Sequence, residues 1–211
     1  MRPVRRYLAL AVGIVLSACG GGGDDGGTNP PPPAVTLGSI VPSATTLNLG
    51  AGQSQTLSAT ARDANNNTIA ATGYTYSSAS NTVAVVSSAG RVTGLSAGTT
   101  TITVSLTLNG VTKTASVSVT VTGALPTAAT VVAGATTNDF TPDLVAIARG
   151  GTVTWTFGAL IHNVEFGTTT GAPQGIGNSQ NTQATRTFAS AGTFAYTCTL
   201  HSGQNGTVLV P

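Results

Sequence analysis

Between residues 34 and 122, the sequence consists of short runs in which apolar and polar residues alternate. A period of two places apolar side chains on one face of a β-strand, so these runs predict half-buried strands. The predicted strands cover 47–49, 55–59, 83–86, 101–104 and 116–121, and turns are predicted at Gly50, 65–67, Gly94, Gly98 and 109–110. Several short strands at such spacing predict a β-sandwich.

A second β-type pattern runs from residue 129 to residue 211, after a hinge predicted at 123–128. Its predicted strands cover 129–132, 144–148 and 152–157, followed by a hairpin at 188–198 and a last strand at 206–210. Trp155, the single tryptophan, is predicted to be a core residue, with a part in electron transfer as the weaker alternative. Because 211 residues leave room for two domains, each of about 90 residues, we predict an all-β chain with domains at 34–122 and 129–211.

The first 18 residues have the pattern of an export signal. Three arginines precede an uncharged run from 7 to 18, which is too short to span a bilayer as a helix. The run ends in Leu-Ser-Ala-Cys at 16–19, which resembles a bacterial lipobox, whose cysteine becomes the lipidated first residue. We therefore expect a signal peptide at 1–18 and a lipid anchor on Cys19. An ordinary cleaved signal with an incidental cysteine is the alternative.

Residues 19–33 are predicted to be a linker. Glycines would make its beginning flexible, and four consecutive prolines would make its end stiff and extended. Such a linker holds folded domains away from a membrane surface. By the same lipobox resemblance, Gly20 in place of aspartate favours the outer membrane, so we expect a location in the cell envelope, facing the periplasm or the cell surface.

Charge argues against one class of partner. Loss of the three arginines with the signal would leave five basic and six acidic residues, a formal charge of −1 instead of +2. A protein without a basic patch is a poor candidate for nucleic-acid binding. We therefore expect no nucleic acid among the partners.

The candidate chemistry lies in the second pattern. Cys198 and His201 are three residues apart, and the only other histidine is His162. If these side chains converge, they offer one thiolate and two imidazoles, the trigonal set of blue-copper centres. In an oxidising compartment an unpartnered Cys198 would be oxidised or cross-linked unless it were buried or bound to metal. Zinc binding, or an empty and degenerate site, is the alternative.

A fourth, weak axial ligand usually completes such a trigonal set. The position three after His201 holds Gln204, and the only methionine is Met1, within the predicted signal. An amide oxygen is an accepted substitute for an axial thioether. We therefore predict Gln204 as the axial ligand, with a side chain that points to solvent as the alternative.

The pattern as a whole resembles a known family. The segments that carry the resemblance are TVTW at 152–155, HNV at 162–164, FASAGTFAYTC at 188–198 and GTVLV at 206–210. They make residues 129–211 similar to the cupredoxins, small blue copper proteins such as plastocyanin and pseudoazurin. The resemblance implies a Greek-key β-sandwich that binds one type 1 copper ion through His162, Cys198 and His201. It also places a variable loop or short helix at 167–183. Gln204 departs from the plastocyanin pattern and resembles the stellacyanin branch.

The first domain resembles a different family. Residues 84–102, AVVSSAGRVTGLSAGTTTI, look like part of a bacterial immunoglobulin-like group 2 domain, with glycines where its turns need them. This domain contains no histidine and no cysteine, so nothing in it suggests catalysis. A spacer is the first interpretation, and adhesion or glycan binding is the alternative.

Two functions follow from these expectations. The first is a membrane-anchored single-electron carrier with the immunoglobulin-like domain as a stalk, working with redox proteins that the sequence does not identify. The second is a surface adhesion or interaction lipoprotein whose cupredoxin-like domain is structural or sequesters copper. The sequence lacks the additional histidines of a substrate-binding copper centre, so we do not expect an enzyme.

Overall fold

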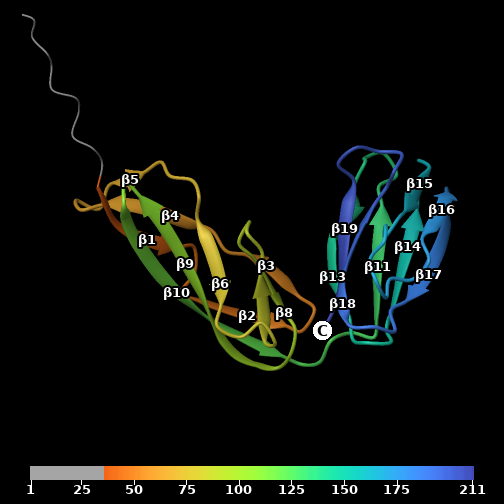
Figure 1. Ribbon diagram of the computed structural model, residues 1–211, viewed down its shortest axis with the longest axis horizontal. Coiled ribbons are helices and arrows are strands. Elements are labelled where there is room, and N and C mark those ends of the chain that lie inside the picture. Colours follow the sequence, from red (N-terminus) through yellow and green to blue (C-terminus); the bar gives the residue numbers. More distant parts are fainter. Residues whose placement is uncertain (1–35) are drawn as a thin grey trace, which may run out of the picture. The chain divides into compact units, whose positions relative to one another are not determined.

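The computed structural model describes residues 36–211 (Figure 1). All regular elements in this range are β-strands, which confirms the all-β prediction. The described residues contain no helix that is long and apolar enough to cross a membrane. The predicted signal, the predicted lipid anchor on Cys19 and the whole predicted linker at 19–33 lie outside the described residues.

Ten strands form a first sandwich. They are β1 (Leu37–Pro42), β2 (Thr46–Gly50), β3 (Ser54–Thr56), β4 (Ala59–Asp63), β5 (Thr68–Ile69), β6 (Thr75–Ser78), β7 (Ala84–Val86), β8 (Arg91–Gly94), β9 (Gly98–Leu108) and β10 (Val111–Thr122). Their sheets have the orders β1-β4-β5, β2-β10-β9-β6 and β3-β8-β7. No described sheet mixes these strands with later ones.

The hairpin β9–β10 shows how local sequence sets this sandwich. Leu108 pairs with Val111, so Asn109 and Gly110 form a two-residue turn. Their φ angles of 50° and 79° suit the left-handed turn that Asn-Gly favours. On β10, residues Val117, Val119 and Val121 alternate with more exposed ones, and their side chains are buried in an aliphatic core.

Nine strands form a second sandwich. They are β11 (Ala128–Ala133), β12 (Phe140–Thr141), β13 (Leu144–Ala146), β14 (Thr152–Phe157), β15 (His162–Val164), β16 (Ile176–Ser179), β17 (Thr182–Thr187), β18 (Gly192–Thr197) and β19 (Asn205–Val210). The sheets have the orders β12-β11-β14-β17, β13-β19-β18 and β15-β16.

The core of the second sandwich is aromatic. Strand β14 has alternating burial, and it directs Val153, Trp155 and Phe157 inward. Trp155 is fully buried and contacts Tyr196, Phe166 and Phe188 through ring centroids 5.3, 6.0 and 6.4 Å away. The prediction of Trp155 as a core residue is confirmed.

Three local predictions need correction. The run 55–59 belongs to two strands, β3 and β4, which lie in different sheets. The chain crosses from one sheet to the other at Leu57, which is fully buried and donates its backbone N–H to Gly90 O. Gly94 and Gly98 lie at strand ends rather than in turns. The stretch 167–183 is neither a plain loop nor a helix, since it contains β16 and the start of β17. Only Ile176 of β16 is buried, so the strand has no visible periodicity.

Candidate metal centre

The hairpin β18–β19 positions three of the four predicted ligands. Thr197 pairs with Asn205 at the end closed by the loop, and this loop carries Cys198, His201 and Gln204. Backbone hydrogen bonds close this loop on itself, with Cys198 N–H donating to Gln204 O at 3.0 Å. A Cys-x-x-His-x-x-Gln spacing within a closed loop brings the three side chains together.

Strand β15 brings in the fourth residue from elsewhere in the sequence. His162 is its first residue, and just after its end Glu165 and Thr197 exchange two backbone hydrogen bonds at 3.0 and 3.1 Å. These bonds fix β15 beside the end of β18, and they place His162 next to Cys198. Glu165 is itself exposed and does not belong to the cluster.

The structure brings His162, Cys198 and His201 into one cluster. Their candidate ligand atoms, one from each side chain, all lie within 4.8 Å of one another. Cys198 Sγ lies 3.5 Å from His201 Nδ1, and the two imidazole centroids are 4.8 Å apart. His162 and Cys198 are buried, while His201 is partly exposed. Among residues 36–211 this is the one group of three or more such side chains placed to hold a metal ion.

Gln204 points into this cluster. Its Oε1 lies 2.9 Å from His162 Nδ1 and 3.0 Å from His201 Nδ1. Its Nε2 donates a hydrogen bond of 2.8 Å to the carbonyl oxygen of Asp139. The alternative of a solvent-directed Gln204 is wrong, because the residue is only 1% exposed. The amide oxygen therefore faces the same point as the two Nδ1 atoms, and its role as axial ligand stays a prediction.

Hydrogen bonds outside the cluster orient its members. His162 Nε2–H donates to Gly134 O at 2.8 Å, which leaves Nδ1 without a proton and free to bind a metal. The backbone N–H of Asn163 points at Cys198 Sγ at 3.5 Å.

Asn163 also fixes the ligand loop. Its Oδ1 accepts from Thr199 N–H at 2.8 Å, and its Nδ2 donates to Thr199 Oγ1 at 2.7 Å and to Asn178 Oδ1 at 3.3 Å. Thr199 lies directly after Cys198, so this side chain ties β15 to the loop. Sequence reasoning noted Asn163 only as the residue that follows a histidine, and it missed Gly134, Asp139 and Thr199. The first two of these contribute backbone carbonyl groups, which leave no signal in side-chain type.

Aromatic side chains pack beside the cluster. The ring centroid of Phe140 is 6.4 Å from that of His162 and 5.0 Å from that of Tyr196. Burial raises the pKa of Tyr196, so its phenol stays protonated across the physiological range. Hydrogen bonds from Thr137 and then Thr141 lower the pKa of the exposed Asp139, which keeps a negative charge near the site. The cluster thus has an apolar inner side and one outer carboxylate.

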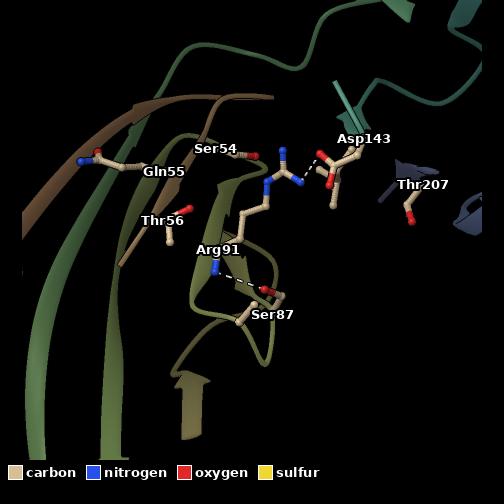
Figure 2. Close-up of a pocket in the computed structure, with 9 residues that line it drawn as sticks. Ser54, Gln55, Thr56, Ser87, Arg91, Asp143 and Thr207 are labelled. Atoms are coloured by element: carbon tan, nitrogen blue, oxygen red, sulfur yellow. Dashed lines mark hydrogen bonds and ion pairs between the residues drawn. The ribbon is translucent and has the colours of Figure 1, made fainter. Parts of the chain in front are cut away.

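A cavity of about 590 Å³ within residues 35–211 differs from the metal cluster in its lining residues (Figure 2). Arg91 pairs with Asp143 at its edge, and the backbone N–H of Arg91 donates a 3.1 Å hydrogen bond to Ser87 Oγ. The remaining polar lining consists mainly of hydroxyl and amide groups, and no residue of the metal cluster lines it. Such a lining offers neither a nucleophile with its base nor a metal site.

The donor set fits one metal of intermediate softness. A thiolate and two imidazoles suit copper in both of its common oxidation states, and a single amide oxygen suits a weak fourth position. His162 Nε2–H and Gln204 Nε2–H each donate a hydrogen bond to a backbone carbonyl, which offsets part of the cost of burying these two side chains. The cluster is therefore suited to a single copper ion.

Comparison with known proteins covers each sandwich separately. Residues 34–119 match the family model of the bacterial Ig-like domain (group 2). No curated protein matches the chain. Among solved structures, the chain is similar to amicyanin from Paracoccus versutus, with 27% identity and a TM-score of 0.35 over 40% of this chain and 81% of that one.

Two further solved structures are similar to this chain. A copper-containing nitrite reductase from Thermus scotoductus SA-01 has 23% identity and a TM-score of 0.35, over 44% of this chain and only 24% of that one. A mutant plastocyanin of a fern has 23% identity and a TM-score of 0.34, over 39% of this chain and 99% of that one. The predicted all-β fold and the predicted His/Cys/His cluster are confirmed, and residues 34–119 match the family predicted for the first domain.

Proposed function

We propose that this protein is a type 1 copper protein that carries single electrons and is tethered to a membrane by lipid on Cys19. One observation carries the proposal: His162 Nδ1, Cys198 Sγ, His201 Nδ1 and Gln204 Oε1 face a common point in the second sandwich. When bound there, a copper ion would supply the one-electron couple between Cu(I) and Cu(II).

The protein's own contribution is a rigid and mostly dry setting for these side chains. His162 is held by Gly134 O, Gln204 by Asp139 O and the loop by Asn163. Side chains fixed by such bonds rearrange little when the charge at the site changes, which keeps electron transfer fast. Burial of His162 and Cys198 excludes water that could compete as a ligand.

The exposure of residues around the cluster indicates where electrons would enter it. His201 is the one partly exposed residue of the cluster. The residues Ile161 and Leu200, which precede the two histidines, are 48% and 46% exposed. Exposed apolar side chains beside a partly exposed ligand favour brief contact with another protein. We propose that redox proteins dock at this surface, with no nucleic acid involved.

The first sandwich acts in this proposal as a stalk. Its match to the bacterial Ig-like family and its lack of any histidine or cysteine support a spacing role. The linker 19–33 and the lipid on Cys19 would then hold the copper domain at a distance from the membrane, in the outer membrane facing the periplasm or the cell surface. We propose an electron carrier rather than an enzyme, on the single cluster that residues 36–211 contain.

Copper titration of the purified copper-free chain tests the central proposal. We expect one equivalent of Cu(II) to produce an intense blue or green colour that reduction removes and reoxidation restores. The thiolate-to-copper transition is the source of that colour, so the result requires Cys198 in the coordination sphere. A copper complex without the intense band, or no binding, would overturn the electron-carrier function and favour a surface interaction protein.

Cell fractionation tests the anchor. Cys19→Ser should move the protein from the membrane fraction to the soluble fraction, because acyl chains contribute roughly 0.8 kcal/mol of membrane affinity per buried methylene. Ser17→Thr, which leaves Cys19 in place, is the matched control. A natural protein that is soluble and carries no acyl mass would contradict the lipid anchor and leave the copper assignment untouched.

A further inference from the structure

The loop 134–139, between β11 and β12, holds two residues of the candidate centre at once. His162 Nε2–H donates to Gly134 O, and Gln204 Nε2–H donates to Asp139 O, both at 2.8 Å. The ends of the loop are also joined to each other, because Gly134 N–H donates to the same Asp139 carbonyl at 3.0 Å. The position of one carbonyl group, that of Asp139, therefore sets the position of the Gln204 amide.

The side chain of Asp139 holds that carbonyl in place. Its Oδ1 accepts a hydrogen bond from Thr137 Oγ1 within the loop, and its Oδ2 accepts one of 3.1 Å from Thr141 Oγ1 on β12. Hydrogen bonds to a carboxylate are stronger than those between neutral groups. The carboxylate thus ties residue 139 to the chain on both of its sides, and the sheet pairing of Thr141 with Val132 anchors the far side.

The loop leaves no room for a side chain at residue 134. A Cβ atom placed on Gly134 would approach Asp139 Oδ1 and the Thr137 carbonyl oxygen to 2.4 Å each. Heavy atoms do not come so close, so the loop can fold around Asp139 only with glycine at 134. The carboxylate, the two threonine hydroxyls and Gly134 act as one unit.

The orientation of the Gln204 amide matters because its two ends have opposite chemistry. The oxygen accepts hydrogen bonds and binds cations, whereas the NH₂ group only donates, although the two ends have nearly the same size. A half-turn of the amide would direct Nε2 at the cluster and oppose Oε1 to the Asp139 carbonyl oxygen. Only the acceptor at Asp139 O distinguishes the two orientations from outside the cluster.

We propose that Asp139 is a positioning residue that, through its carbonyl group, keeps Gln204 Oε1 rather than Nε2 directed at the metal centre. This inference deepens the proposed function and rests on it for its copper-dependent part. Asp139 does not contact the cluster through its side chain. It acts through Gln204.

Three variants separate positioning from charge. Asp139→Ala removes the acceptor for both threonine hydroxyls. Asp139→Asn removes the negative charge but keeps one amide oxygen as an acceptor, so it is the conservative variant. Thr141→Val removes one of the two hydrogen bonds to the Asp139 carboxylate with little change of shape. It is a milder substitution that can be used if Asp139→Ala folds poorly.

The first measurement uses copper-free protein and hydrogen exchange of the Gln204 side-chain NH₂ group, followed by NMR. Because this group is buried and bonded to Asp139 O, we expect slow exchange in the natural protein. Asp139→Ala should accelerate it about tenfold, a typical effect for one lost hydrogen bond. Thr141→Val should cause a smaller acceleration, and Asp139→Asn should stay near the natural rate. Equal exchange in the natural protein, Asp139→Ala and Thr141→Val would overturn the proposal.

The second measurement uses copper-loaded protein and a double-mutant cycle with Gln204→Met. Methionine has no N–H to donate, so the carbonyl of Asp139 cannot position it. Asp139→Ala should therefore shift the reduction potential and the electron paramagnetic resonance spectrum more in the natural background than in the Gln204→Met background. An equal shift in both backgrounds, matched by Asp139→Asn, would show a charge effect alone and overturn the proposal.

Failure of the positioning role can be distinguished from failure of the proposed function. If the protein binds no copper, the colour test of the proposed function fails, while amide exchange in the copper-free protein still reports on Asp139. If the blue centre forms and neither exchange nor the double-mutant cycle responds to Asp139→Ala, the copper function stands and the positioning role is wrong.

Discussion

The two sandwiches have similar strand patterns but very different interiors. The first has a core of Leu, Ile, Val and Ala, whereas the second contains the single tryptophan and all five phenylalanines of the chain. The buried polar residues differ as well. In the first sandwich they are Thr93 and Thr100, and in the second they are His162, Asn163 and Gln204.

This difference shows what a functional interior requires. A buried imidazole or amide costs free energy unless it is hydrogen-bonded. The two threonines need only one partner each, and they find them in Ser54 Oγ and Ser80 N–H. The histidine, asparagine and glutamine need several, and these come from the loop 134–139, the loop after β18, and β16. Large aromatic rings fill the rest of the interior around such a network and supply the apolar burial that stabilises it.

Substitution of Cys198 should have the largest effect, because it removes the thiolate that only the second sandwich contains. Cys198→Ser should abolish the intense colour of the copper-loaded protein, because that absorption needs the sulfur. The fold should remain, since serine is similar in size to cysteine. Visible absorption and circular dichroism check the two parts. Persistence of the band in this variant would contradict the ligand assignment, and Ser202→Ala in the same loop is a matched control.

Removal of the central aromatic side chain should destabilise the second sandwich alone. Trp155→Ala should cost about 3–5 kcal/mol of its unfolding free energy. Ile102→Ala, at a fully buried position of the first core, should cost about 2–5 kcal/mol there instead. Hydrogen exchange by mass spectrometry, read separately for 37–122 and 128–210, measures both. Equal loss of protection in both ranges from either variant would show that the sandwiches unfold as one unit.

Copper itself should stabilise one sandwich and not the other. A ligand at about 100 times its dissociation constant adds about 2.7 kcal/mol to the stability of the state that binds it. We expect the same hydrogen-exchange experiment, with and without copper, to show this gain only in 128–210. The gain should be much reduced in Cys198→Ser. Protection of 37–122 to a similar degree would argue against a purely local effect.

Substitution of Gln204, the predicted axial ligand, should have the smallest effect. An amide oxygen is a harder donor than a thioether and favours Cu(II), so Gln204→Met should raise the reduction potential. A rise of about 59 mV, the value for a tenfold change in a one-electron equilibrium, is the expected order of magnitude. The electron paramagnetic resonance spectrum should become more axial. If potential and spectrum stay the same, Gln204 is not a ligand.

Much of this architecture can be predicted from local patterns. The alternation at 152–157 coincides with β14, and the Asn-Gly pair at 109–110 forms the turn of the longest hairpin. The Cys-x-x-His-x-x-Gln spacing lies within one hairpin loop, so its three side chains had to be near one another. Strands with little local signal were missed, above all β16, which forms by pairing with β15 and not through a pattern of its own.

The side-chain chemistry of the candidate centre can be predicted from the sequence alone: one thiol in the second domain, two imidazoles, and an amide three residues after the second imidazole. Residue types and short spacings suffice for that, because a donor set is a property of side chains. How this set of donors is held depends on the tertiary structure. Carbonyl groups like those of Gly134 and Asp139 exist at every residue of every protein, and these two acquire a role only because β11 and β12 bring them against His162 and Gln204. A backbone carbonyl can orient a particular side chain only where the fold places the two together, so this role cannot be predicted from residue type.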